Sequence, residues 1–182
     1  FRDFPMLCQL QAKNGLQIGQ NYQNNRGIKE FIASIAQVLR LDTVRGMERC
    51  CFFSVRADGS TDRSVAEQEC VYVRYVIDGV PVNKFLSLEA VDDSSALGVL
   101  AAIDASLCSR ASVTLEVQKK KLININLDGA AVNMGVHNGV GAKQKQRIGD
   151  HLVVTHCINH GLELAILDLR KSDSYLVIFD ST

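Results

Sequence analysis

Several features are missing from this sequence of 182 residues, and each absence excludes a class of protein. Twenty basic residues balance twenty acidic ones, so no overall positive field attracts a polyanion, and any contact with nucleic acid must come from a local patch. No apolar run approaches the roughly 20 residues that a membrane span needs, and no signal segment opens the chain. The sequence therefore predicts a soluble protein that is not secreted and has no membrane partner.

Paired cysteine motifs are also missing. The six cysteines are scattered without a C-x-x-C pair, and several lie in apolar runs, where a free cysteine behaves as a small hydrophobe. This pattern predicts six free thiols in a reducing, intracellular compartment. The chain begins at Phe1 rather than Met, and we expect it to be a fragment of a longer protein.

The residues that are present, 47% apolar and 22% charged, are ordinary for one globular domain with a sizeable core. The first fifty residues have helical patterns. A short helix is predicted to stop near Gly15, and a second helix has an apolar face that repeats through Phe31, Ile35 and Leu39. We therefore expect a helical lead-in over residues 1–50 and a main domain over residues 51–182.

Strand patterns follow the lead-in. Three antiparallel strands are predicted over residues 52–57, 70–77 and 82–91, with Asp78-Gly79 as a hairpin turn. The later pattern predicts a helix that runs through Leu97 to Leu107, a strand over 122–127, a helix over about 130–147, a strand over 151–155 and a helix over about 159–170.

This βββαβαβα order is the element order of the ribonuclease H fold, an α/β architecture. It predicts a mixed five-stranded sheet of order 3-2-1-4-5 with flanking helices, in which the first and fourth strands are adjacent and parallel. We expect the fold to be incomplete at its C-terminus. The carboxyl ends of these two strands should meet, which is where open α/β sheets place their chemistry.

Two aspartates follow these strands, in Asp58-Gly59 and Asp128-Gly129. Carboxylates held close together repel, and a shared Mg²⁺ or Mn²⁺ ion relieves the repulsion while also taking phosphate oxygens as ligands. Two such ions stabilise the attacking and leaving oxygens of phosphoryl transfer. The glycine after each aspartate is expected to leave room for substrate. Asp-Gly is also a common turn dipeptide, so a solvated turn is the alternative at each position.

Cys157 and His160 lie three residues apart, ahead of the last predicted helix. One Cys-x-x-His pair lacks the second ligand pair of a closed zinc site, so no zinc is expected within this chain. Two basic clusters, at residues 119–121 and 143–147, predict solvated faces, with phosphate contact as the alternative. The other three histidines, His137, His151 and His156, are expected at the surface or in loops.

Three stretches, in this order, resemble the hAT superfamily of DNA transposases. The resemblance is to the transposon-derived vertebrate branch, which includes a protein described as a SUMO ligase. Residues 53–62 resemble the family's first catalytic strand, residues 128–140 its second acidic motif, and residues 156–164 its Cys-x-x-His block before an amphipathic helix. Order and spacing agree across residues 50–170, which makes the resemblance more specific than any one motif.

The resemblance implies roles for four residues. Asp58 and Asp128 match the catalytic metal site of a ribonuclease H-like nuclease, with Mg²⁺ or Mn²⁺ as cofactor. Cys157 and His160 match a block that organises the active site and the DNA end. The family's third acid, a Glu after a long insertion, and its dimerisation segment have no counterpart in these residues.

Two classes of function follow from this resemblance. Because a site that lacks one of three acidic ligands should lose most of its catalytic power, we expect a transposon-derived nuclear protein that is catalytically inactive. It would act as a binding or interaction module with DNA or protein partners. The alternatives are an active hAT transposase core that cleaves and transfers DNA strands with two metal ions, or a SUMO ligase-like protein.

Overall fold

The structure, a computed structural model, describes residues 3–61 and 67–172. The chain divides into two compact units, Phe1–Asp42 and Thr43–Thr182. The first unit contains helix α1 (Phe4–Lys13) and the first part of helix α2 (Asn25–Arg49). Helix α1 ends just before Gly15, whose backbone φ of +87° is a conformation that favours glycine, in agreement with the predicted stop.

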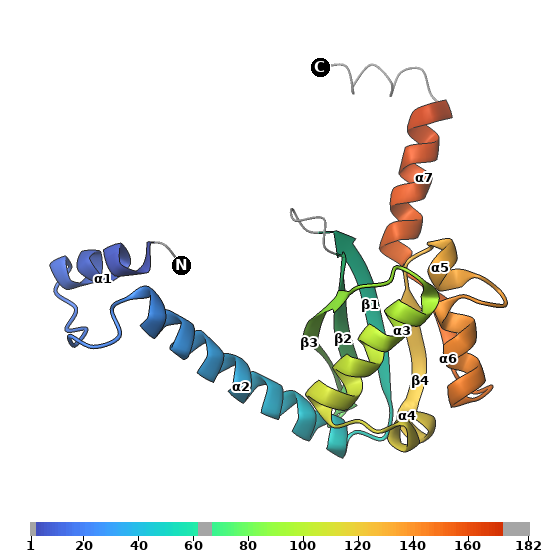
Figure 1. The fold of residues 1–182 in the computed structure, drawn as a ribbon, viewed down its shortest axis with the longest axis horizontal. Helices are drawn as coiled ribbons and strands as arrows, with labels where there is room; N and C mark the ends of the chain where they lie inside the picture. The colour runs from blue at the N-terminus through green and yellow to red at the C-terminus, as the bar shows by residue number, and fades with distance from the viewer. Residues whose placement is uncertain (1–2, 62–66, 173–182) are drawn as a thin grey trace. The chain divides into compact units, whose positions relative to one another are not determined.

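The second unit is built on one mixed sheet of five strands. Its strands are β1 (Phe53–Thr61), β2 (Glu67–Ile77), β3 (Val80–Val91), β4 (Leu122–Leu127) and β5 (Val153–His156). Their order is β3-β2-β1-β4-β5, with β1 antiparallel to β2 and parallel to β4 (Figure 1). The predicted α/β fold and its strand order of 3-2-1-4-5 are therefore confirmed.

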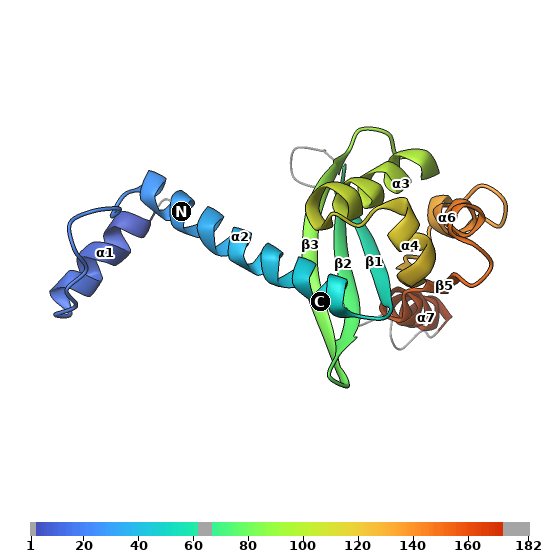
Figure 2. The ribbon, with the colours of Figure 1, turned by 90° about the horizontal axis from the view of Figure 1, so that it is seen from below.

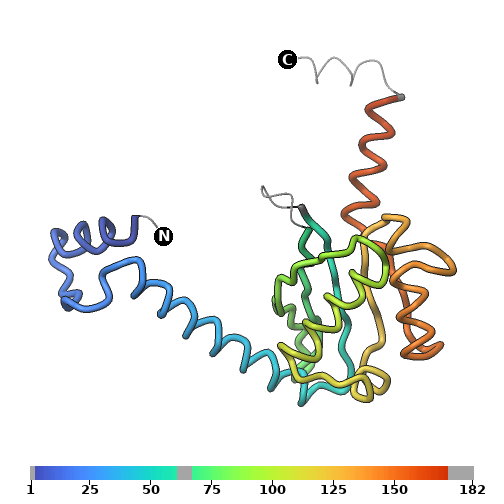
Figure 3. The backbone as a smooth tube through the Cα atoms, in the orientation of Figure 1, coloured from blue at the N-terminus to red at the C-terminus, as the bar shows by residue number. Residues whose placement is uncertain are grey.

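A tight hairpin and two helical crossovers produce this strand order. Asp78 and Gly79 join β2 to β3 with φ values of +50° and +78°, as the predicted hairpin turn requires. The chain then crosses to β4 through α3 (Ala96–Asp104), the π-helix η1 (Ala105–Arg110) and α4 (Leu115–Lys121), a path that Figure 3 traces. From β4 it passes through α5 (Ala131–Met134) and α6 (Val140–Ile148) to β5, and α7 (Ile158–Ser172) follows.

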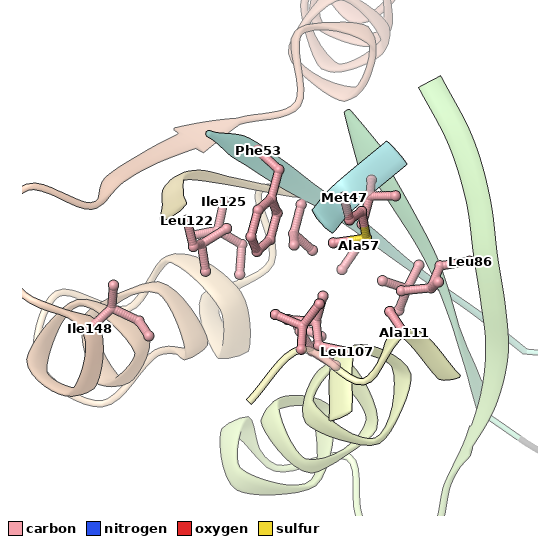
Figure 4. Close-up of a cluster of buried hydrophobic side chains, with 14 of the residues drawn as sticks. Met47, Phe53, Ala57, Leu86, Leu107, Ala111, Leu122, Ile125 and Ile148 are labelled. Atoms are coloured by element: carbon pink, nitrogen blue, oxygen red, sulfur yellow. The ribbon is translucent and has the colours of Figure 1, made fainter. Parts of the chain in front are cut away.

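Alternation along the strands gives the sheet one buried face. Phe53, Val55 and Ala57 of β1 are at most 3% exposed and belong to one hydrophobic core (Figure 4). Residues of α3 and α6 complete this core, and Figure 2 shows both helices on the same side of the sheet. Burial of a large apolar side chain contributes about 1.5–3 kcal/mol. Because side chains alternate along β1, its even-numbered residues point to the opposite face, which is also the face of the two aspartates.

The structure corrects the helix predicted over residues 130–147. The segment splits into α5 and α6 around Gly135 and Gly139. The backbone approaches itself so closely here that a Cβ atom on Gly139 would lie 2.5 Å from the Gly135 nitrogen. A continuous helix is therefore replaced by two helices with a tight glycine connection.

Two further element boundaries differ from the sequence predictions. Helix α4 was not predicted, although Thr114 caps it by accepting a hydrogen bond from the Val117 nitrogen. Strand β5 begins at Val153, two residues later than predicted.

Among the described residues, no single helix is both long and apolar enough to cross a membrane; Ala96–Arg110 and Leu115–Lys121 pass that test only as a pair bent by 99°.

Candidate functional site

Asp58 and Asp128 lie at the same end of the sheet. The parallel pairing of β1 with β4 runs to Arg56 and Asn126, and each aspartate is two residues beyond that pair. Because side chains alternate along a strand, Asp58 shares the face of Arg56, and Asp128 continues the face of Asn126. We call this end of the sheet, with Asp58 and Asp128, the aspartate edge. It lies beside the starts of α5 and α7 (Figure 1). The fold thus brings the two predicted aspartates together.

The setting of Asp58 differs from the prediction in one respect. Strand β1 does not end at residue 57 but continues to Thr61, because its last residues keep pairing with β2 from Asp58–Cys70 to Thr61–Glu67. The interpretation of Asp58-Gly59 as a strand-ending junction is therefore wrong. Asp58 is fixed within a strand and is half-buried, with its side chain 41% exposed. A solvated Asp-Gly turn is thereby also excluded at this position.

Asp128 is held by donors from the segment that follows it. Its Oδ1 accepts hydrogen bonds from the Ala130 backbone nitrogen at 3.0 Å and from Asn133 Nδ2 at 2.7 Å. Asn133 is buried, at 5% exposure, so its amide depends on this contact. One carboxylate oxygen of Asp128 thus orders the turn into α5, which is a structural role that the sequence left open.

The glycines after the aspartates do not open space for a substrate in the way that was expected. A Cβ atom on Gly59 would lie 3.3 Å from Glu69 Oε2, and one on Gly129 would lie 2.5 Å from His156 Nε2. Protein side chains therefore occupy the room that these glycines provide. Their physical role is to allow Glu69 and His156 to pack against the backbone at the aspartate edge.

Cys157 and His160 face this edge from the start of α7. His160 Nε2 lies 3.8 Å from Asp58 Oδ1. Hydrogen bonding with Cys157 raises the pKa of His160, and the carboxylates of Asp58 and Asp128 add to that rise. The same hydrogen bonding lowers the pKa of Cys157, whose Sγ also accepts from Arg56 Nη2 at 3.4 Å. Cys157 and the two carboxylates thus favour the protonated form of the His160 imidazole.

Glu69 is a third carboxyl group near the aspartates, and the sequence analysis missed it. It is 3% exposed on the buried face of β2, in the alternating series with Val71 and Val73. Burial, followed by the charges of Asp128 and Asp58, raises the pKa of Glu69 to about 7. Its Oε1 is buried without a hydrogen-bond partner in the described part of the chain. Strand alternation was the signal that placed this acid toward the core.

Asp58 and Asp128 are the residues that could hold a hard cation at this end of the sheet. Two carboxylates from neighbouring strands supply oxygen ligands of the kind that Mg²⁺ and Mn²⁺ prefer, with phosphate oxygens completing the shell. Within residues 3–61 and 67–172, no group of three or more His, Cys, Asp or Glu side chains has the geometry to hold a metal ion. Glu69 does not add to the pair, because its side chain lies on the buried face.

The two basic clusters serve the fold in part. Lys121 Nζ donates to the backbone oxygens of Met47, Glu48 and Cys50, at 3.3, 2.9 and 2.9 Å, which ties the end of α2 to the start of β4. Arg147 forms a two-pronged ion pair with Asp104 of α3. These two cations are therefore committed to internal partners, and a phosphate ligand would have to displace them.

The second unit can now be compared with a known family. The model of the family described as "ZMYM1/FAM200, RNase-like domain" (DUF4371) matches residues 12–137, which is more than half of the chain. The matched region includes both Asp58 and Asp128, whereas Cys157 and His160 lie outside it. The description agrees with the sheet order and crossovers of the second unit, and the match is consistent with a transposon-derived protein.

Proposed function

Because this chain belongs to the ZMYM1/FAM200 RNase-like domain family, we propose that it is a transposon-derived domain that binds DNA without cutting it. The observation that carries the proposal is the position of Asp58 and Asp128 on one face of the sheet, each two residues beyond the last pair of the parallel β1–β4 ladder. We place the origin of the domain in the hAT superfamily, on the motifs around these aspartates and around Cys157. The nucleus follows as the compartment where its ligand is found.

The aspartate edge would bind a phosphate through a metal cation that the two aspartates hold. Asp58 and Asp128 would bind one Mg²⁺ or Mn²⁺ ion, which would supply a positive charge for a backbone phosphate. Arg56 adds a guanidinium next to Asp58 on the same strand face, and His160 adds an imidazole whose pKa is raised. The four groups thus place two carboxylates beside an arginine and a histidine at one end of the sheet.

The same geometry argues for binding rather than cleavage. Two-metal phosphoryl transfer needs two ions a few ångströms apart, and both must be held by acidic ligands. One oxygen of Asp128 is already used by Ala130 and Asn133, and His160 Nε2 lies 3.8 Å from Asp58 Oδ1. The ligands that remain suit one ion. We therefore expect DNA binding that depends partly on metal and no strand scission by the 182-residue chain.

The alternative is the core of an active transposase. One observation favours this alternative: the two aspartates follow the pairing of two adjacent parallel strands. That arrangement would serve a nuclease as well as a site that only binds DNA. The SUMO-linked role that the resemblance implies stays a prediction.

Fluorescence anisotropy with a labelled DNA duplex and a labelled single strand tests the proposal, with and without Mn²⁺. We expect binding to at least one probe, and Asp58→Asn combined with Asp128→Asn should remove the gain in affinity that Mn²⁺ provides. Asp150→Asn is the control, since Asp150 is exposed and precedes β5 at the other end of that strand. Absence of binding to both probes would refute the proposal. Metal-dependent cutting that disappears with Asp58→Asn would establish the nuclease alternative.

A further inference from the structure

A groove of about 550 Å³ lies on the sheet face opposite the hydrophobic core. We propose that this groove binds single-stranded nucleic acid and leads the strand to the edge of Asp58 and Asp128. The inference deepens the proposed function and rests on it, since it names the form of nucleic acid and the surface that receives it.

The groove is organised as two rows of paired residues across four strands. Strand pairing aligns Asn126, Arg56, Tyr72 and Phe85 in the first row, and Asn124, Ser54, Arg74 and Asn83 in the second row. All of these residues except Phe85 line the groove itself. We call this surface the open face. It is a continuous polar and aromatic surface that crosses most of the sheet.

Charge on the open face favours a polyanion. The nine residues that line the groove include Arg56 and Arg74 and no carboxylate. Arg74 is exposed, and within the described residues its guanidinium makes no hydrogen bond or ion pair. An unpaired arginine in a groove is free to form two parallel hydrogen bonds with a phosphate. The zero net charge of the whole chain makes this local concentration of positive charge informative.

Aromatic side chains on the open face favour unpaired bases. Tyr72 and Phe85 are 41% and 54% exposed, and their ring centroids are 5.5 Å apart in an edge-on arrangement. Exposed rings on a sheet offer flat surfaces on which single-stranded bases stack. A duplex keeps its bases stacked on one another and has no free base face to offer. The rings therefore select a single strand over a duplex.

Asparagines on β4 give the groove a fixed polar wall. Asn124 Nδ2 donates to Val153 O at 3.0 Å and to Thr155 Oγ1 at 3.2 Å, and Asn126 Nδ2 donates to Thr155 Oγ1 at 3.0 Å. These contacts to β5 hold both amides in place beside Ser54 and Arg56. A wall that is already ordered loses little side-chain entropy when a ligand binds.

The groove is continuous with the aspartate edge. Asp58 follows Arg56 by two residues on the same face of β1, a spacing of about 6.6 Å along a strand. A nucleic-acid strand that extends past the first row therefore reaches the two carboxylates. Its phosphates would be repelled there unless a divalent cation lies between the phosphates and the carboxylates. Metal binding at the edge and strand binding on the open face should consequently support each other.

The test measures the affinity of the full chain for labelled oligo(dT) and for a duplex hairpin across a salt series. The variants are Arg74→Ala, the pair Tyr72→Ala with Phe85→Ala, and the control Lys120→Ala, which removes an exposed cation from α4. We expect tighter binding of oligo(dT) than of the duplex. Arg74→Ala should weaken oligo(dT) binding several-fold and reduce the slope of log affinity against log salt by about 0.7, since one phosphate contact is lost.

The aromatic variant should weaken oligo(dT) binding by about tenfold or more, the loss of stacking for one or two bases. The control should match the parent, and thermal melts establish that each variant is folded. Equal or tighter binding of the duplex would overturn the inference, as would an Arg74→Ala slope equal to that of Lys120→Ala. If the duplex binds, either of these two results leaves the proposed function intact and rejects only the inference about the groove. If neither oligo(dT) nor the duplex binds, the proposed function itself is rejected.

Discussion

Glu69 should make the stability of this protein fall as the pH rises. Its pKa is raised from 4.5 to about 7 in the folded chain, because the carboxyl group is buried and lies near the charges of Asp128 and Asp58. Between these two pH values the folded state holds a proton that the unfolded state has released. The stabilisation is complete below pH 4.5 and is lost as the pH rises through about 7.

The magnitude follows from the two pKa values. Each pKa unit corresponds to about 1.4 kcal/mol, so the full effect is about 3 kcal/mol, of which about 2.5 kcal/mol falls between pH 5 and pH 8. Glu69→Gln keeps the shape of the side chain and removes its titration. The free energy of unfolding of Glu69→Gln, relative to the parent, should therefore increase by about that amount from pH 5 to pH 8.

Urea denaturation of both proteins across this pH range measures the difference. The pKa of His160 is also raised, but His160 is present in both proteins, so its contribution cancels to first order when they are compared. Glu67→Gln is the matched control, because Glu67 is exposed on the same strand, and its curve should run parallel to that of the parent. Parallel curves for Glu69→Gln and the parent would refute the raised pKa of the buried Glu69 carboxyl group.

Three further outcomes are expected. Asp128→Ala should destabilise the fold by about 1–2 kcal/mol in urea denaturation, because Ala130 and buried Asn133 lose their acceptor, whereas Asp128→Asn should keep most of the stability; equal losses would contradict the hydrogen bonds to Asp128 Oδ1. Gly141→Ala should cost about 1–3 kcal/mol, since its Cβ would lie 2.5 Å from Val154 Cγ1, and a double-mutant cycle with Val154→Ala should show a favourable coupling between the two changes; additive losses would exclude that clash. Alkylation of denatured, non-reduced protein should label all six cysteines in mass spectrometry, and a lower number of adducts would reveal a disulfide.

The sequence by itself determined the order of the elements and the strands that carry the aspartates. Alternation in Val71, Val73 and Tyr75, the turn residues Asp78-Gly79 and the apolar run ending at Leu127 are local signals, and local propensities express them directly. Handedness rules then restrict the crossovers, so the adjacency of Asp58 and Asp128 could be predicted from this order. Their chemical environment could not be predicted in the same way.

Only the tertiary structure decided which groups surround the aspartates. Glu69 lies on β2, and its raised pKa depends on burial and on the charges of Asp128, which follows β4, and Asp58 of β1. The end of β1 at Thr61 depends on pairing with β2, and the split between α5 and α6 depends on backbone contact at Gly139. The open face likewise requires four strands in register to place Arg56, Arg74 and Tyr72 together, since neighbours across a sheet are set by pairing and not by proximity in the chain.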